Sequence, residues 1–174
     1  MALKIDLEKA FDCIEWSFIK EVLVNFNFPS NLIAIVMDCI SSIFVSVLFN
    51  GGKLPTFSPS RGNYQGDPLS PYIFILCLEY LGLLIQDKIA NRTWKPIKAS
   101  RSNLVFSHLF FADDLMLFGQ ASLKKSEAID EVLTIFCRLS GQRVSKEISR
   151  VLFSKSTPEE SRRAICCFLG ILEA

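Results

Sequence analysis

Three carboxylates interrupt apolar segments of the chain, where acidic side chains are unfavourable. Asp6 ends a short alternating segment, and Asp113 with Asp114 interrupts the apolar run of residues 109–118. An unpaired carboxylate that leaves water loses several kcal/mol, so we expect a cation to compensate these groups. Hard oxygen ligands suit Mg²⁺, and two such ions ~4 Å apart would suit in-line phosphoryl transfer. The pattern therefore predicts a divalent-metal site.

A plainer interpretation of the same residues stays open. Two adjacent aspartates at a turn are commonly a solvated hairpin tip, because Asp favours turns through local hydrogen bonds. A single Asp at the end of a strand is also unremarkable in itself. The metal-site hypothesis therefore depends on the other motifs of the chain.

The elements that must position these carboxylates follow from periodicity and turn signals. We expect strands at residues 2–7, 44–49, 53–57, 104–111, 115–118 and 151–154. We expect helices at residues 15–26, 30–43, 68–90 and 126–139, with Pro68 in the first turn of the third, and a last helix from Pro158 to the C-terminus. Asn50-Gly51 predicts a tight hairpin turn, and residues 112–114 join two strands. This order predicts an α+β fold with helices packed on one face of a mainly antiparallel sheet.

Length and composition indicate one folded domain. The chain has 174 residues, of which half are hydrophobic and 21% are charged. The net charge is +1, from 19 Lys and Arg against 18 Asp and Glu. Proteins that grip a nucleic-acid backbone unaided are usually far more basic. The charge therefore neither supports nor excludes a nucleic-acid partner.

Cysteine usage and hydropathy indicate an intracellular protein without a membrane span. Six cysteines form no C-x-x-C pair and His108 is the single histidine, so we expect no zinc site. Residues 32–49 carry one charge, Asp38, and approach the length of a membrane span. Serines dilute this segment, and we expect a buried helix followed by a strand. Charged residues interrupt the N-terminus, so no signal peptide is expected.

Three segments together resemble the palm motifs of reverse transcriptases of non-LTR (LINE-type) retrotransposons, the plant sequences in particular. Residues 6–12 (DLEKAFD) are similar to the first motif, and residues 61–71 (RGNYQGDPLSP) to the second. Residues 111–114 (FADD) are similar to the third, and all three occur in the order of that family. The resemblance covers nearly the whole chain. It implies a polymerase palm and an RNA-directed DNA polymerase.

The resemblance also implies roles for individual residues. Asp6 and Asp113 would be the principal catalytic metal ligands, with Asp114 as a third carboxylate, for two Mg²⁺ ions that Mn²⁺ can replace. Phe11 would be the steric gate against a ribose 2′-hydroxyl, although its pattern alone favours core packing. The pair 65–66, Gln and Gly, would contact the incoming deoxynucleoside triphosphate.

The implied partners are an RNA template, a DNA primer and a deoxynucleoside triphosphate. Arg61 and Tyr64 are the candidate template contacts, although relatives generally carry a basic residue at position 64. Relatives also carry a lysine where this chain has Ile148, and Lys146 is the one nearby lysine that could donate a proton to the leaving group. Such a proton donor typically contributes ~10²–10⁴-fold to the rate.

The resemblance places residues 1–174 as a single partial domain. It implies that the fingers precede residue 1 and that the primer grip and thumb follow residue 174, so we expect the chain to be inactive alone. The family suggests the nucleus as its compartment. Two alternatives stay open: a decayed, non-catalytic fragment that acts at most as a passive interaction module, and a two-metal nuclease that uses the same carboxylates.

Overall fold

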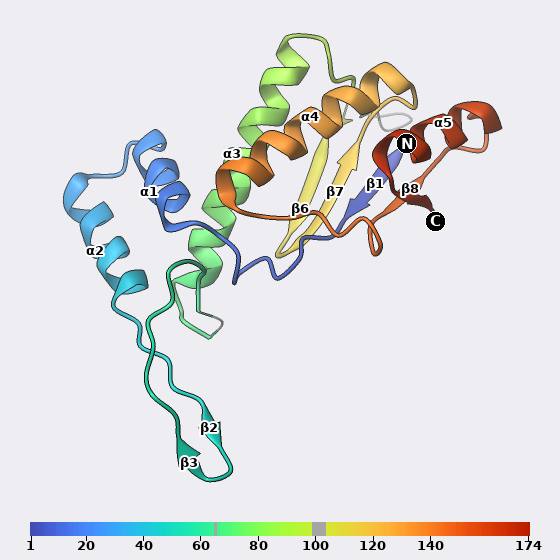
Figure 1. The fold of residues 1–174 in the computed structure, drawn as a ribbon. Coiled ribbons are helices and arrows are strands. Elements are labelled where there is room, and N and C mark those ends of the chain that lie inside the picture. Colours follow the sequence, from blue (N-terminus) through green and yellow to red (C-terminus); the bar gives the residue numbers. More distant parts are fainter. Residues whose placement is uncertain (65, 99–103) are drawn as a thin grey trace.

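The computed structural model describes residues 1–64, 66–98 and 104–174. A five-stranded sheet forms one layer, and helices α3 (Ser70–Ala90) and α4 (Leu123–Ser140) cross one of its faces (Figure 1). Its strands follow the order β6-β7-β1-β8-β9. Their bounds are β1 Ala2–Ile5, β6 His108–Phe111, β7 Asp114–Phe118, β8 Arg150–Leu152 and β9 Leu172–Glu173. The pairs are antiparallel except β8 with β9, so the predicted α+β class with a mainly antiparallel sheet is confirmed.

The core lies between the sheet and these helices. Leu3, Ile5, Leu115 and Leu117 alternate along β1 and β7 and are fully buried. Because successive side chains of a strand point to opposite faces, these four residues share the face that the helices cover. On α3 the buried side chains recur at helical spacing, and they include Ile73, Phe74, Cys77, Leu78, Leu81 and Ile85. Among the helices of the described residues, none covers the opposite face of the sheet.

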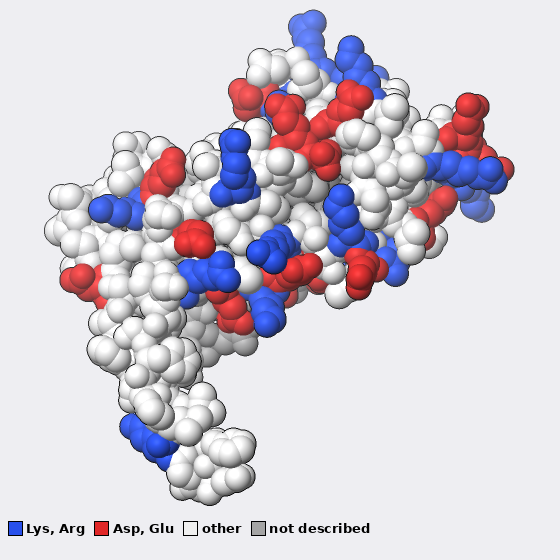
Figure 2. All heavy atoms as spheres, viewed as in Figure 1, with Lys and Arg blue, Asp and Glu red and all other residues white. Residues whose placement is uncertain are grey.

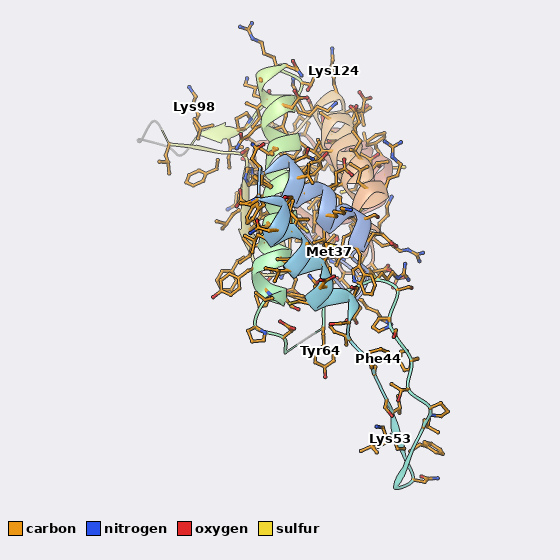
Figure 3. The ribbon with its side chains drawn as sticks, turned by 90° about the vertical axis from the view of Figure 1, so that its left-hand side faces the viewer. Met37, Phe44, Lys53, Tyr64, Lys98 and Lys124 are labelled. Carbon is orange, nitrogen blue, oxygen red and sulfur yellow. The ribbon has the colours of Figure 1, made fainter. Side chains whose placement is uncertain are left out.

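A projecting hairpin leaves the body of the molecule after helices α1 (Trp16–Asn25) and α2 (Ser30–Ser41). It contains strands β2 (Leu48–Phe49) and β3 (Gly52–Lys53), joined by the predicted turn, in which Asn50 and Gly51 both have positive φ. Figure 3 shows Phe44 at its root and Lys53 towards its tip. The large exposed apolar side chains of this arm are Phe44, Val47, Leu48, Phe49, Leu54 and Phe57.

Several expected element bounds are wrong, and the strand expected at residues 104–111 is split into β5 (Val105–Phe106) and β6. Helix α3 begins at Ser70 and has Pro71 in its first turn, because Asp67 accepts the amide of Leu69 in a preceding turn. Helix α2 is not a buried helix. Ile33 and Ile40 are buried, and its other residues are half-buried or exposed.

The strands expected at residues 44–49 and 53–57 are both shorter, and beyond β2 and β3 they share one isolated bridge, between Val45 and Phe57. The last helix, α5 (Glu159–Leu169), stops before the C-terminus. Gly170 ends it in the left-handed conformation, and the chain then adds β9 to the sheet.

The remaining observations concern a small second sheet, the cysteines and the lengths of the helices. Strands β4 (Ile97–Lys98) and β5 (Val105–Phe106) form a separate antiparallel pair. All six cysteines are free thiols. Across the described parts of the chain, every helix is too short or too polar to span a bilayer.

Candidate active site

The sheet brings the first and third motifs to the same end of its strands. Strand β1 pairs with β7 so that Ile5 lies opposite Leu115, and β7 returns from β6 through a turn at Ala112 and Asp113. The β1–β7 ladder ends at Ile5 and Leu115, and extending its register by one residue places Asp6 across from Asp114. Since Ile5 and Leu115 face the helices, Asp6 and Asp114 take the open face of the sheet. Positive φ at Ala112 makes this tight return possible.

The backbone of Asp6 is held by the segment before β8. Its amide donates to Ser149 Oγ at 3.0 Å, and its carbonyl accepts the amide of Ser145 at 2.9 Å. Both serines are buried, and Leu7 bridges Val144 beside them. The main chain at Asp6 is therefore fixed, while its carboxylate accepts no hydrogen bond from any described residue.

The acidic side chains themselves are more exposed than the sequence predicted. Asp113 and Asp114 are exposed and Asp6 is half-buried, so the expectation of carboxylates costly through burial is wrong for the hairpin. Both hairpin carboxylates lie at the tip of the β6–β7 hairpin, where water surrounds them. Asp114 Oδ1 instead lies 3.1 Å from Lys4 Nζ. Over residues 1–64, 66–98 and 104–174, no three His, Cys, Asp or Glu side chains converge as a formed metal site.

An open groove of about 540 Å³ adjoins Asp6. Three cationic side chains, Lys9, Arg61 and Arg143, line it beside Asp6 and Glu8. The guanidinium of Arg61 lies 3.5 Å from the carboxylate of Glu15. Figure 2 shows cations and anions intermixed over this central face, whereas the projecting hairpin is almost uncharged. A groove with cations beside a carboxylate can take a polyanion together with a divalent cation.

Backbone hydrogen bonds join the first and second motifs. Asn63 N–H donates to the carbonyl of Phe11 at 2.7 Å, and Gly62 N–H donates to that of Ile14 at 2.7 Å. The indole Nε1 of Trp16 donates to the carbonyl of Gly62 at 2.8 Å. A Cβ at position 62 would lie 2.6 Å from the carbonyl oxygen of Asp12, so only glycine permits this approach.

Phe11 has a structural role in the fold as well as its predicted one. Its half-buried ring stacks on Phe74 of α3, with centroids 4.6 Å apart. The nucleotide-binding prediction for position 65 falls outside the described residues. Its neighbour Gly66 is exposed with φ +103°, and Tyr64 is exposed near the root of the projecting hairpin (Figure 3).

The structure does not bring Lys146 to the groove beside Asp6. Its Nζ would meet a Cβ on Gly170 at 3.4 Å, so it lies at the end of α5. It lines a different cavity, between α4 and α5, of about 310 Å³. The position in the groove beside Asp6 belongs to Ile148, which is 61% exposed.

Sequence reasoning assigned no role to five residues around the site. Lys4 has a usable signal, since a side chain two residues before Asp6 on a strand shares its face. Lys9 and Arg143 have none, because their convergence depends on the pairing of distant segments. Gln142 and Asn63 are nearly fully buried, and polar atoms of both lack hydrogen-bond partners among the described residues.

Comparison with a family model decides the family. The model for reverse transcriptase (RNA-dependent DNA polymerase) matches residues 1–171. The chain belongs to the reverse transcriptase family. The predicted likeness to non-LTR retrotransposons within that family is confirmed by the relatives described next.

Two relatives of this reverse transcriptase chain are Pol polyproteins of R2 retrotransposable elements. That of Drosophila melanogaster is 26% identical over 156 residues, which cover 90% of this chain and 14% of the polyprotein. That of Popillia japonica is 24% identical over 145 residues, covering 83% of this chain and 23% of the polyprotein. An uncharacterized mitochondrial protein of Arabidopsis thaliana is 41% identical over 71 residues, 41% of this chain and 58% of that protein. The chain thus spans a small part of either polyprotein.

Solved structures of telomerase share the fold of this reverse transcriptase chain. Telomerase from Candida albicans superposes with a TM-score of 0.64 and 16% identity, over 90% of this chain and 28% of the telomerase. Telomerase from Candida tropicalis gives 0.62 and 16%, over 85% of this chain and 29% of that chain. At this identity the likeness concerns the fold alone, and it agrees with the predicted palm.

Proposed function

We propose that this chain is the palm of an RNA-directed DNA polymerase that extends a DNA primer along an RNA template. The observation that carries the proposal is the β1–β7 register, which brings Asp6 to the hairpin of Asp113 and Asp114 on the open face of the sheet. Family membership over residues 1–171 supports the same reaction class. The whole polymerase would include segments beyond these residues.

The reaction is a nucleotidyl transfer. The primer 3′-hydroxyl oxygen forms a bond to the α-phosphorus of a deoxynucleoside triphosphate. The bond from that phosphorus to the oxygen bridging to the β-phosphate breaks, and pyrophosphate leaves. The hydroxyl loses its proton to solvent water, and negative charge develops on the leaving pyrophosphate. The chain must therefore orient the primer hydroxyl, the α-phosphate and the pyrophosphate that leaves. It must also neutralise the negative charge on the phosphates.

The donor set at the sheet edge fits Mg²⁺ or Mn²⁺ in its chemistry. Asp6, Asp113 and Asp114 supply exposed or half-buried carboxylate oxygens, the ligand type that these ions prefer. We propose that these three residues hold two ions. When bound, the ions would supply charge neutralisation at the attacking and leaving oxygens. Asp6 would contribute from a backbone already fixed by Ser145 and Ser149.

The cationic groove is suited to the triphosphate. Lys9, Arg61 and Arg143 line the same open groove as Asp6, so phosphates seated there would lie beside the carboxylate. Arg61 presents a planar guanidinium that can contact two phosphate oxygens at once. We propose that these three cations bind the β- and γ-phosphates, with Arg61 also near the template.

The remaining predicted contacts concern sugar and base. We propose that Phe11 excludes a ribose 2′-hydroxyl through its ring edge, while the stack on Phe74 keeps that ring in place. The pair Gln65 and Gly66 would contact the incoming nucleotide, with Gly66 allowing close backbone approach. Tyr64, exposed and apolar on its faces, would stack on a template base.

Intrinsic catalysis should be slow. Ile148 lines the groove at the position where the retrotransposon resemblance implies a lysine, and Lys146 lies at Gly170 instead. Without a nearby general acid the pyrophosphate leaves as a poorer group. We also propose that fingers and thumb segments beyond these residues are needed to hold the template and primer. On this proposal the 174-residue chain alone is inactive, and the compartment of the polymerase is the nucleus.

Primer extension on an RNA template tests the proposal. A longer polypeptide with family fingers and thumb should extend the primer with Mg²⁺ or Mn²⁺. Asp113→Asn should reduce the rate at least a hundredfold. Asp38→Asn, the same change at an exposed position of α2, should leave the rate unchanged. Equal rates for wild type and Asp113→Asn would reject the proposal.

A second candidate is a decayed, non-catalytic fragment. Two observations favour it: Ile148 stands in the groove, and no three acidic side chains converge among the described residues. This candidate predicts no Asp6-dependent metal binding and no extension by the longer polypeptide. A calorimetric titration in which Asp6→Asn removes Mn²⁺ binding would count against it. The nuclease alternative predicts cleavage of a labelled RNA–DNA hybrid with Mn²⁺, and an uncut hybrid would exclude it.

A further inference from the structure

Lys4 lies on the open face of the sheet, directly beside Asp114. It precedes Asp6 by two residues on β1, so strand alternation sends both side chains to the same face. Its Nζ is 3.1 Å from Oδ1 of Asp114. The side chains of Lys4 and Asp114 are 51% and 55% exposed. It is the one ion pair that any of the three proposed ligands makes with a described residue.

This ion pair competes with a divalent cation for the same oxygens. A lysine ammonium has three donors and no acceptor, so it cannot share a carboxylate with a metal ion without mutual repulsion. The described residues contain no converged acidic triad, and Asp114 is the member of the trio that already has a partner. The Lys4 ammonium therefore occupies the Asp114 oxygen that a shared divalent cation would also need.

The neighbouring cation on this face is otherwise engaged. Arg150 lies opposite Lys4 in the β1–β8 register. Its Nη1 donates to the backbone carbonyls of Glu147 and Ser149, which holds the guanidinium against the segment that precedes β8. Lys4 is thus the cation on this face whose partner is Asp114.

We propose that Lys4 is a positioning residue that pairs with Asp114 and is displaced when a divalent cation binds. The inference rests on the proposed function, since it takes Asp6, Asp113 and Asp114 as the metal ligands. An exposed ion pair contributes little to stability, so a cation can displace it. Lys4 then lowers the metal affinity of the cluster and sets the ion concentration at which Asp114 joins it.

Manganese binding to the 174-residue chain tests this inference. Free Mn²⁺ is followed by its electron paramagnetic resonance signal during titration of wild type, Lys4→Met and Lys20→Met. Lys20 is an exposed lysine on α1 and controls for the change in net charge. We expect Lys4→Met to bind Mn²⁺ about two- to fivefold more tightly, and Lys20→Met to bind as the wild type does.

A double-mutant cycle separates the ion pair from a general charge effect. Replacing Asp114 with Asn removes the partner, so adding Lys4→Met in that background should change the affinity by less than about twofold. Lys4→Arg keeps a cation and should leave the affinity near that of the wild type. Urea unfolding of each variant checks that it is folded.

Three outcomes would overturn the inference. Lys4→Met, shown to be folded, binds Mn²⁺ no more tightly than the wild type; Lys20→Met tightens binding equally; or no form of the chain binds Mn²⁺. In the first two cases, Asp6→Asn abolishing Mn²⁺ binding leaves the polymerase proposal intact. The Asp113 comparison in primer extension decides that proposal separately in every case.

Discussion

The ring of Phe11 stacks on the ring of Phe74 with centroids 4.6 Å apart and planes 30° from parallel. One side chain of the first motif is thereby packed against helix α3, which begins at the end of the second motif. The same ring that would select the sugar is also part of the hydrophobic core.

Replacement of Phe11 should affect both selectivity and stability. Phe11→Val should raise the ratio of kcat/KM for ribonucleotides over deoxynucleotides at least tenfold in the longer polypeptide, because it clears space beside the sugar. It should also lower the free energy of unfolding by about 1–3 kcal/mol through the lost stack and burial. Phe11→Tyr keeps the ring and serves as the control. Unchanged selectivity in Phe11→Val would leave core packing as the whole role of this residue.

Position 148 offers a gain-of-function prediction. Ile148→Lys puts an ammonium into the groove beside Asp6, so single-turnover extension by the longer polypeptide should accelerate about tenfold or more. Ile148→Met, which has similar length and no charge, should remain at the wild-type rate. Lys146→Met should also leave the rate unchanged, since Lys146 lies at Gly170. A loss of activity in Lys146→Met would return the proton-donor role to that residue.

Glycine is required at position 62 by close backbone contact. Gly62→Ala places a Cβ 2.6 Å from the carbonyl oxygen of Asp12 at a φ of +88°, and we expect a loss of about 2–4 kcal/mol in urea unfolding. Gly51 has a φ of +78° and open space around its Cβ position. Gly51→Ala should therefore lose only about 1–2 kcal/mol, from backbone strain alone. Equal losses would mean that the contact at Asp12 relaxes without resistance.

Stability should fall in alkaline solution through a buried thiol. Burial raises the pKa of Cys77 to about 12, whereas an unfolded thiol titrates near ~8.5. Above the lower value the unfolded chain releases this proton first, so the free energy of unfolding decreases as the pH rises towards the folded pKa. Between pH 8.5 and 10 the wild type should lose about 1–2 kcal/mol more than Cys77→Ala does. Urea titrations at several pH values measure this, with Cys167→Ala as the exposed control, and parallel curves for wild type and Cys77→Ala would contradict it.

Local patterns predicted most of the secondary structure. Helices α1 and α4 and the turn at Asn50 and Gly51 follow from periodicity and turn chemistry, which act over a few residues. The start of α3 was misplaced because two prolines, Pro68 and Pro71, could each occupy a first helical turn. Sequence alone does not distinguish them, since the choice depends on the Asp67 turn that precedes the helix.

Strand pairing was beyond local patterns. Strand β9 is two residues long, and nothing in its own residues indicates that it joins β8 in parallel. The groove beside Asp6 likewise combines Lys9, Arg61 and Arg143 from three separated segments. Their convergence is a property of the packed chain.

The amino-acid sequence by itself determined the residue types of the three motifs, the hairpin turn at Ala112 and Asp113, and the family to which they point. Tertiary structure alone decided that β1 lies between β7 and β8, which sets Asp6 beside the hairpin and Lys4 against Asp114. The physical reason is that backbone hydrogen bonds between strands form in the same way whatever the separation of the two strands in the sequence. Residues more than a hundred positions apart pair only because the helices bury one face of the sheet that they form together.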